Sequence, residues 1–321
     1  MENIAIGVRN LKKHYDINRG MFKGKAILRA VDDISFELYR GETLGIVGES
    51  GCGKSTTGKM ILKIEEPSSG EIVYKGKDIK DFYKKELKDY RKNIQIVFQD
   101  PYSSLNPRWR ICDIIAEPIK LNTKLGSRKL ENKVLELMKK VGLNEESYLR
   151  YPHQFSGGQR QRIGLARAIA LNPEIIICDE PVSALDVSIQ AQVINLLMEL
   201  QRELKLTYIF ISHDLGVVRY ISDRVIVMYM GKIVEIGTSK NLFNNPKHPY
   251  TIALLDSIPD INISEKKERM LLEGDIPTPI NPPSGCRFRS RCVYAKKECK
   301  QVDMKLVEIE DGHKTACPFF M

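Results

Sequence analysis

The segment GESGCGKST at Gly48–Thr56 has the residue types and the spacing of a phosphate-binding loop. A short apolar run, Leu44–Gly48, leads straight into it, and a helical pattern begins at Lys54. Glycines let backbone amides approach an anion, and the N-terminus of the following helix favours negative charge. We expect Lys54 to reach the β- and γ-phosphates, Ser55 to bind Mg²⁺ and Thr56 to touch phosphate. The segment therefore predicts binding of a nucleoside triphosphate with Mg²⁺.

Two adjacent acids, Asp179 and Glu180, end a second apolar run, EIIICDE at Glu174–Glu180. A carboxylate at the C-terminal end of a central strand can hold the Mg²⁺ shell beside a phosphate-binding loop. Neighbouring carboxylates repel each other, so a cation or a catalytic duty explains the pair better than a solvated strand end. We assign Asp179 to Mg²⁺ and Glu180 to the base that orients the attacking water.

A third motif, FSGGQ at Phe155–Gln159, lies just upstream of the acidic run. Ser156 followed by glycines is by itself an ordinary helix N-cap. Together with the phosphate-binding loop, in this order and spacing, the motif resembles the ATP-binding-cassette (ABC) ATPases. Those enzymes hydrolyse ATP at the interface of two cassettes, so the resemblance implies that function depends on a partner.

The resemblance implies a role for each matching residue of the nucleotide site. Gln99 matches the glutamine that senses Mg²⁺ and water and reports to the membrane domain, and His213 matches the histidine that contacts the γ-phosphate. The Mg²⁺ ligands are then Ser55, Gln99 and Asp179. The residues expected to bind the ATP of their own cassette are Tyr15, Gly48, Ser50, Gly51, Gly53, Lys54, Ser55 and Thr56.

A second group is expected to contact the ATP held by the opposite cassette. The resemblance places in it Ser156, Gly157, Gly158, Gln159 and, from the SALD segment that crosses between cassettes, Asp186. Two ATPs would close the dimer, and hydrolysis at Glu180 would open it. Phe155 replaces the usual leucine, a mild departure, and the other motifs match the active pattern. We therefore expect a competent site.

Tyr15 matches the aromatic residue that stacks on adenine, an interaction worth roughly 1–3 kcal/mol by analogy with base–aromatic contacts. The stretch that follows Tyr15 carries a basic insert around Arg19–Lys25 before the sheet resumes. Phe22 or Tyr39 therefore remains open as the adenine partner, and so does a plain core role for any of these aromatic residues.

Alternating strands and helices must position these motifs. Residues 4–43 alternate apolar and polar side chains, which indicates an antiparallel sheet. The runs Ile94–Gln99, Glu174–Glu180 and Thr207–His213 predict parallel strands joined by helices, and Arg224–Gly237 predicts a hairpin turning at Gly231. The predicted fold class is α/β: an ABC-type P-loop NTPase with an antiparallel β subdomain, a RecA-like parallel core and a helical signature subdomain at about residues 100–170.

The composition changes near residue 256, after which prolines among polar residues are followed by cysteines. This change predicts a nucleotide-binding domain at 1–255 and a small C-terminal domain at 256–321. Four of the seven cysteines lie in that last part, at Cys286, Cys292, Cys299 and Cys317. Clustered thiols in a reducing compartment favour metal over disulfides. The short spacing of zinc pairs is absent. The expectation is a [4Fe–4S] cluster, as the family resemblance also implies, with zinc or metal-free thiols as alternatives.

Three stretches resemble the oligopeptide/dipeptide (peptide/nickel) importer family: YPHQFSGGQRQRIGLARAIALNPEIIICDE, VFQDPYSSLNPR and NNPKHPYTIALLDSIP. The basic insert is similar to the second, F-type ATPase of that family. The resemblance implies import of di- or oligopeptides, with a second, non-identical ABC ATPase, two integral membrane permeases and an extracytoplasmic substrate-binding protein as partners. The chain would lie peripherally on the cytoplasmic face of the cell membrane.

The bulk composition leaves alternatives open. The 321 residues carry a net charge of +9, which permits nucleic acid, acidic lipid or ATP as partner. We see no signal peptide and no apolar run near the ~20 residues of a membrane helix. A soluble ABC ATPase acting on nucleic acid or ribosomes usually has a long coiled-coil insertion or two cassettes, which this chain lacks, so no nucleic acid is expected. Import of nickel or another small solute, or an exporter cassette, are the other readings.

Overall fold

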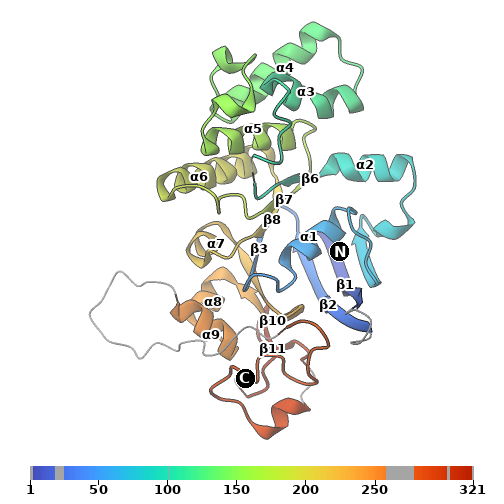
Figure 1. Ribbon diagram of the computed structural model, residues 1–321, viewed down its shortest axis with the longest axis vertical. Coiled ribbons are helices and arrows are strands. Elements are labelled where there is room, and N and C mark those ends of the chain that lie inside the picture. Colours follow the sequence, from blue (N-terminus) through green and yellow to red (C-terminus); the bar gives the residue numbers. More distant parts are fainter. Residues whose placement is uncertain (1–2, 19–24, 101, 258–277, 302–303, 320–321) are drawn as a thin grey trace. The chain divides into compact units, whose positions relative to one another are not determined.

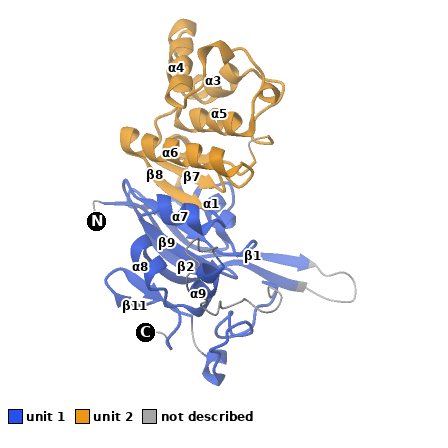
Figure 2. Ribbon diagram, turned by 90° about the vertical axis from the view of Figure 1, so that its left-hand side faces the viewer, with its two compact units in different colours: residues 1–81, 212–321 blue, residues 82–211 orange. Residues whose placement is uncertain are grey.

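The structure is a computed structural model that describes residues 3–18, 25–100, 102–257, 278–301 and 304–319. The chain divides into two compact units, unit 1 with residues 1–81 and 212–321 and unit 2 with residues 82–211 (Figure 2). Phe22 and most of the basic insert lie outside the described residues. None of the helices in the described ranges is long and apolar enough to cross a membrane.

Unit 1 contains an antiparallel sheet with the strand order β2-β1-β4-β5. Its strands are β1 Ile4–Asn18, β2 Lys25–Tyr39, β4 Ser69–Tyr74 and β5 Lys77–Asp78. In β2 the buried side chains of Ile34, Phe36 and Leu38 alternate with exposed Ser35 and Glu37, the period of a sheet with one buried face. The antiparallel sheet expected from residues 4–43 is confirmed.

The same unit holds strands of a second sheet, in the order β11-β12-β10-β9-β3. They are β3 Thr43–Val47, β9 Arg224–Tyr229, β10 Lys232–Thr238, β11 Val307–Glu310 and β12 His313–Thr315. β3 is buried along its whole length and runs parallel to β9. The expected hairpin of β9 and β10 turns at Gly231, whose φ of +79° suits glycine. The helices of this unit are α1 Lys54–Ile61, α7 Leu215–Ile221, α8 Ser239–Asn244 and α9 Pro249–Asp256.

The C-terminal region joins this second sheet. β12 pairs antiparallel with β10, where Glu235 lies opposite Thr315, and β11 forms a hairpin with β12. The buried carboxylate of Glu235 lies 2.7 Å from Nε2 of His313, which is also fully buried. The domain boundary between residues 255 and 256 stays a prediction, and the structure adds that β12 pairs with β10.

Unit 2 contains three parallel strands in the order β8-β7-β6, namely β6 Ile94–Val97, β7 Ile175–Asp179 and β8 Thr207–Ile211. The helix α6 Val187–Leu204 connects β7 to β8 and buries one apolar face on the way. That face includes Val193, Leu197 and Leu200, as its spacing predicts, and also Ile194. The parallel core and the mixed α/β fold are confirmed.

The helical part of unit 2 consists of α3 Ile111–Asn122, α4 Ser127–Lys140 and α5 Gly157–Ile169, which lie together in both views (Figures 1 and 2). The helix α2 Lys85–Asn93 precedes β6. Each of α3, α4 and α5 buries an apolar stripe, and the buried residues of α4 are Val134, Leu137 and Met138. This spacing of three and four residues is why the stretch forms a helical subdomain and adds no strand.

Candidate nucleotide-binding and hydrolysis site

The phosphate-binding loop lies in unit 1, between the end of β3 and the start of α1. Gly48 and Gly53 take φ values of +146° and +108° there. A Cβ atom at Gly48 would lie 2.1 Å from the carbonyl oxygen of Met228, and one at Gly53 would lie 2.4 Å from that of Ala30. Both positions therefore require glycine, and the close approach fixes the loop against β9 and β2.

The ammonium group of Lys54 lies inside this loop. Its side chain is nearly buried, with 5% of the residue exposed. Nζ donates to the carbonyl oxygen of Gly48 at 2.7 Å and to that of Glu49 at 3.1 Å. Nζ also donates to Sγ of Cys52 at 3.9 Å. A buried cation held by neutral groups such as these is well placed to accept an anion as a stronger partner. The glycine cradle and this ammonium together fit a triphosphate.

Tyr15 of β1 lies beside the start of α1. Its hydroxyl donates to Glu65 and also contacts Thr56 of the phosphate-binding loop. Burial, with the Glu65 carboxylate, raises the pKa of Tyr15 to about 12. Lys13 Nζ stands 5.0 Å from the ring centroid. Tyr39, in contrast, donates to Glu37 at 3.0 Å on the same strand. Of these two tyrosines, Tyr15 therefore contacts the phosphate-binding loop, through Thr56.

His213 follows Ser212 in unit 1 and is exposed. The backbone N–H of Ser212 donates to the carbonyl of Ile46 in β3 at 3.2 Å. Asp214 then caps α7 by accepting from the N–H of Val217 at 3.1 Å. The chain direction thus brings His213 to the end of β3 at which the phosphate-binding loop begins.

The acidic pair lies at the end of β7 in unit 2. Asp179 is the last residue of the strand, and Glu180 follows with a φ of +47°, a conformation that non-glycine residues rarely adopt. The N–H of Glu180 donates to Ile211 at 2.9 Å, which holds this backbone in place. Its carboxylate oxygen Oε2 accepts from Nε2 of Gln99 at 3.0 Å. Two residues predicted from separate motifs are thereby hydrogen-bonded to each other.

The FSGGQ motif begins α5. Ser156 Oγ accepts from the N–H of Gln159, and Gln159 Oε1 accepts from the N–H of Ser156, which is a capping box. A Cβ atom at Gly158 would lie 2.4 Å from Ile189 of α6, so glycine is required. Ser156, Gln159 and Asp186 are exposed, as residues that contact a second molecule must be. The motif is therefore a helix cap and an available surface at once.

The four C-terminal cysteines give the metal interpretation no support. In the described ranges no three His, Cys, Asp or Glu side chains form a group that could hold a metal ion, and none of the seven cysteines, all of which lie in those ranges, forms a disulfide. Burial and the nearby thiols of Cys299, Cys317 and Cys292 raise the pKa of Cys286 to about 11. The remaining thiols Cys52, Cys112 and Cys178 are buried, in agreement with the expected core or loop role.

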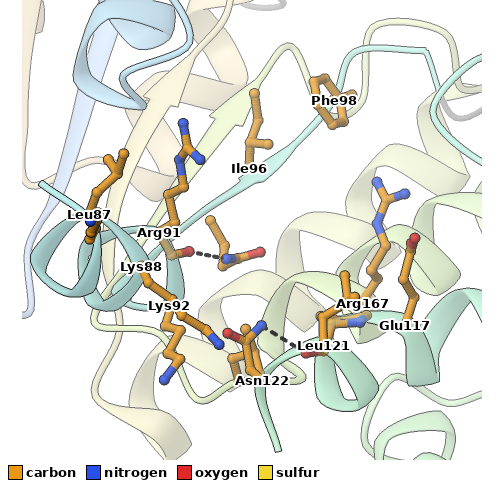
Figure 3. A pocket seen from close by; sticks show the side chains of 14 residues that line it. Leu87, Lys88, Arg91, Lys92, Ile96, Phe98, Glu117, Leu121, Asn122 and Arg167 are labelled. Atoms are coloured by element: carbon orange, nitrogen blue, oxygen red, sulfur yellow. Dashed lines mark hydrogen bonds between the residues drawn. The ribbon is translucent and has the colours of Figure 1, made fainter.

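A groove of about 530 Å³ in unit 2 was not predicted (Figure 3). Its apolar lining residues include Ile96, Phe98 and, from α3, Leu121. The cations that line it from and just before α2 are Lys84, Lys88, Arg91 and Lys92. Phe98, which lines the groove, is the residue before Gln99 in the chain. The corresponding signal in the sequence is the basic stretch KKELKDYRKN, which by itself indicates only net charge.

Comparisons with known proteins agree with this geometry. The family model "ABC transporter" matches residues 31–183, and "Oligopeptide/dipeptide transporter, C-terminal region" matches residues 234–299. The dipeptide transport ATP-binding protein DppF of Haemophilus influenzae is 52% identical over 98% of this chain and 95% of its own length. The oligopeptide transport ATP-binding protein AppF of Bacillus subtilis is 54% identical over 99% of this chain and 98% of its own.

Solved structures give the same answer for the fold. CbiO1 of Clostridium perfringens, part of the ABC transporter complex cbiONQ, has a TM-score of 0.65 and 31% identity over 76% of this chain and 92% of its own. The dimeric cassette MJ0796 bound to ADP and Pi has a TM-score of 0.65 and 29% identity over 73% of this chain and 98% of its own. The resemblance drawn from the motifs is confirmed: the chain belongs to the ABC transporter family, as an ATP-binding subunit of the oligopeptide/dipeptide type.

Proposed function

We propose that this chain hydrolyses ATP to power the import of dipeptides or oligopeptides across the cytoplasmic membrane. The observation that carries the proposal is the near full-length similarity to proteins named for dipeptide and oligopeptide transport, which includes the C-terminal region. The intact phosphate-binding loop and the Gln99–Glu180 hydrogen bond support an active ATPase.

The chemistry divides between two groups of residues. Lys54, with the loop amides, binds the triphosphate, and Ser55, Gln99 and Asp179 hold Mg²⁺, which neutralises charge on the transferred phosphoryl group. Glu180 orients the attacking water, and its hydrogen bond from Gln99 fixes the carboxylate that does so. His213 contacts the γ-phosphate, and Tyr15 stacks on adenine.

A second cassette completes each site, and we propose that it is a non-identical ABC ATPase. The exposure of Ser156, Gln159 and Asp186 supports contact with a partner's nucleotide. The dimeric form of MJ0796 is a relative in which two cassettes are paired. Closure around two ATPs would then place these residues on the nucleotide that Lys54 of the partner binds.

The groove of unit 2 is the surface that we assign to the membrane permeases. Its apolar lining residues and the cations of α2 suit one occupant, an amphipathic segment with acidic side chains. Phe98 in the groove adjoins Gln99, and Gln99 bonds Glu180. Gln99 therefore links Phe98, at the proposed docking surface, to Glu180, the proposed catalytic base. An extracytoplasmic substrate-binding protein would deliver the peptide, and the chain would lie on the cytoplasmic face of the membrane.

The finer proposal for the C-terminal cysteines is a [4Fe–4S] cluster, with zinc as the alternative. Its support is the grouping of Cys286, Cys292, Cys299 and Cys317 in the sequence together with the family resemblance, since the described residues form no metal-binding group. We expect anaerobically purified protein to be brown and to contain iron, as measured by its visible absorption and an iron assay. A colourless, iron-free protein would contradict the cluster, and zinc in its place would select the alternative.

Uptake of a labelled dipeptide and a labelled tripeptide tests the transport function. Cells that lack this chain are expected to lose uptake of at least one of them and to regain it with the wild-type chain. The Lys54→Ala chain should not restore it. Undiminished peptide uptake without the chain, together with loss of nickel uptake, would favour the small-solute alternative.

A further inference from the structure

The segment CRFRSRC, at Cys286–Cys292, lies against the phosphate-binding loop within unit 1. Three of its side chains anchor it there and are nearly buried: Arg287 and Phe288 are 4% and 1% exposed, and the side chain of Arg291 is 6% exposed. Long cationic side chains are rarely buried unless they are paired. Their partners therefore indicate what the segment holds in place.

Arg291 is paired with Glu49, a residue of the phosphate-binding loop. Its two terminal nitrogens donate to the two carboxylate oxygens at 2.8 and 3.0 Å, a bidentate geometry. The hydrogen bond with Glu49 raises the pKa of Arg291, which keeps this guanidinium charged. The backbone carbonyl of the same Glu49 accepts from Lys54 Nζ at 3.1 Å. One residue of the loop is thus held by Arg291 on its side chain and by Lys54 on its backbone.

Tyr250 of α9 holds the same residue from another side. Its hydroxyl accepts from the N–H of Glu49 at 2.9 Å, and its ring is fully buried. The ring centroid lies 4.6 Å from that of Tyr229 and 5.4 Å from that of Phe288. Because Phe288 belongs to the C-terminal segment, this aromatic cluster fixes Tyr250 and the segment together.

Arg287 connects the segment to a turn beside the phosphate-binding loop. It donates to the carbonyl of Met230 and to the carboxylate of Asp32. Burial disfavours the charged form of Asp32, but Arg287 and His14 hold its pKa at about 2. The residue after Met230, Gly231, donates its N–H to the carbonyl of Cys52 at 2.9 Å. The turn that Arg287 binds is therefore the turn that supports the middle of the phosphate-binding loop.

The pairing of Arg291 with Glu49 matters for phosphate binding, because Glu49 places a carboxylate in the phosphate-binding loop. A carboxylate in an anion-binding loop repels phosphate unless a cation neutralises it. A loop of glycines must also lose conformational freedom when it binds, and prior ordering reduces that cost. Arg291 supplies both the neutralising charge and the ordering.

We propose that the Cys286–Cys292 segment is a clamp that positions the phosphate-binding loop for ATP, with Arg291 as the positioning residue that acts through Glu49. The inference rests on the proposed ATP-binding role of the loop. It assigns to the C-terminal region a part in nucleotide affinity that the motifs of the loop itself do not contain.

A double-mutant cycle on the full chain tests the clamp, with a fluorescent ATP analogue as the probe. Arg291→Ala is expected to weaken binding about tenfold, the loss of one charge-assisted bidentate contact. In a Glu49→Ala background the same substitution is expected to change affinity less than about twofold, because the charge through which it acts is gone. The control is Arg289→Ala, since Arg289 is in the same segment but donates to Ser284; its affinity should match the wild type.

Equal losses from Arg291→Ala in both backgrounds, or no loss in either, would overturn the proposal. Amide hydrogen exchange of the peptide that covers residues 48–56 gives a second readout that needs no nucleotide. The clamp predicts faster exchange there in Arg291→Ala than in Arg289→Ala, and unchanged exchange would overturn it as well. A wild-type chain that binds no ATP analogue would instead defeat the proposed function, and the exchange measurement would still decide the clamp.

Discussion

Glu180→Gln is expected to bind ATP and to lose turnover. The backbone of Glu180 has a left-handed conformation, and its carboxylate accepts a hydrogen bond from Gln99, which orients it. The amide of glutamine keeps the size but is no base, and a positioned base typically contributes about 10²–10⁴-fold to rate. Phosphate release should fall by that amount in the intact complex, while the affinity for the ATP analogue stays within about twofold.

The matched control is Glu199→Gln, which changes an exposed glutamate on α6 of the same unit. Its turnover should equal that of the wild type. Normal phosphate release by the Glu180→Gln protein would show that another group orients the water, and the role assigned to Glu180 would be wrong. A loss of ATP binding together with turnover would indicate a folding defect, which a melting temperature measured on both variants identifies.

Lys54→Ala is expected to weaken nucleotide binding itself. The ammonium is the buried cation of the loop, and its removal also leaves the carbonyls of Gly48 and Glu49 without their donor. We expect affinity for the ATP analogue to fall about a hundredfold or more, as measured by fluorescence titration. ATPase activity should be lost at nucleotide concentrations that saturate the wild-type chain.

Lys59→Ala serves as the control, because Lys59 is an exposed lysine on the same helix. Its affinity for the ATP analogue should equal that of the wild type. Removing an exposed charge near a helix end changes the free energy of unfolding by only about a few tenths of a kcal/mol. Wild-type affinity in the Lys54→Ala protein would contradict the phosphate-loop assignment and with it the ATP-binding role of Gly48–Thr56.

Most of the core fold was predictable because it depends on local patterns. The apolar run before Gly48 and the helix after it are continuous in sequence, and a loop of this composition forms where a strand meets a helix. The same holds for Asp179 at the end of β7 and for the hairpin at Gly231. Each of these features lies within a short stretch, so periodicity and turn residues are enough to place it.

The remaining features join residues far apart in the chain, and their types alone do not name their partners. Glu49 and Arg291 are separated by 242 positions, and nothing in either segment selects the other. The groove beside Phe98 is built from α2, α3 and α5, so a basic stretch in the sequence reads only as net charge. The pairing of β12 with β10 also joins distant residues, and the sequence between them does not predict which residues lie opposite each other.

The C-terminal cysteines show that closeness in sequence alone does not predict a metal site. Cys286, Cys292, Cys299 and Cys317 cluster in sequence, and burial together with the thiols of Cys299 and Cys317 raises the pKa of both Cys286 and Cys292. Metal ligation depends on geometry as well as proximity, and in the part of the chain that the structure describes no such group is formed. Two of the three arginines between the first two cysteines, Arg287 and Arg291, have the clearer structural role, because they are paired with residues at or beside the phosphate-binding loop.

Co-purification of the Glu180→Gln protein from native membranes in the presence of ATP tests the central claim most directly. The variant should hold ATP without turnover and so retain its assembled complex, whose components can then be identified. The proposal predicts two integral membrane proteins and a second, non-identical ABC ATPase. A complex with nucleic acid or ribosomes and no membrane subunit would contradict the transport function and leave only the ATPase chemistry.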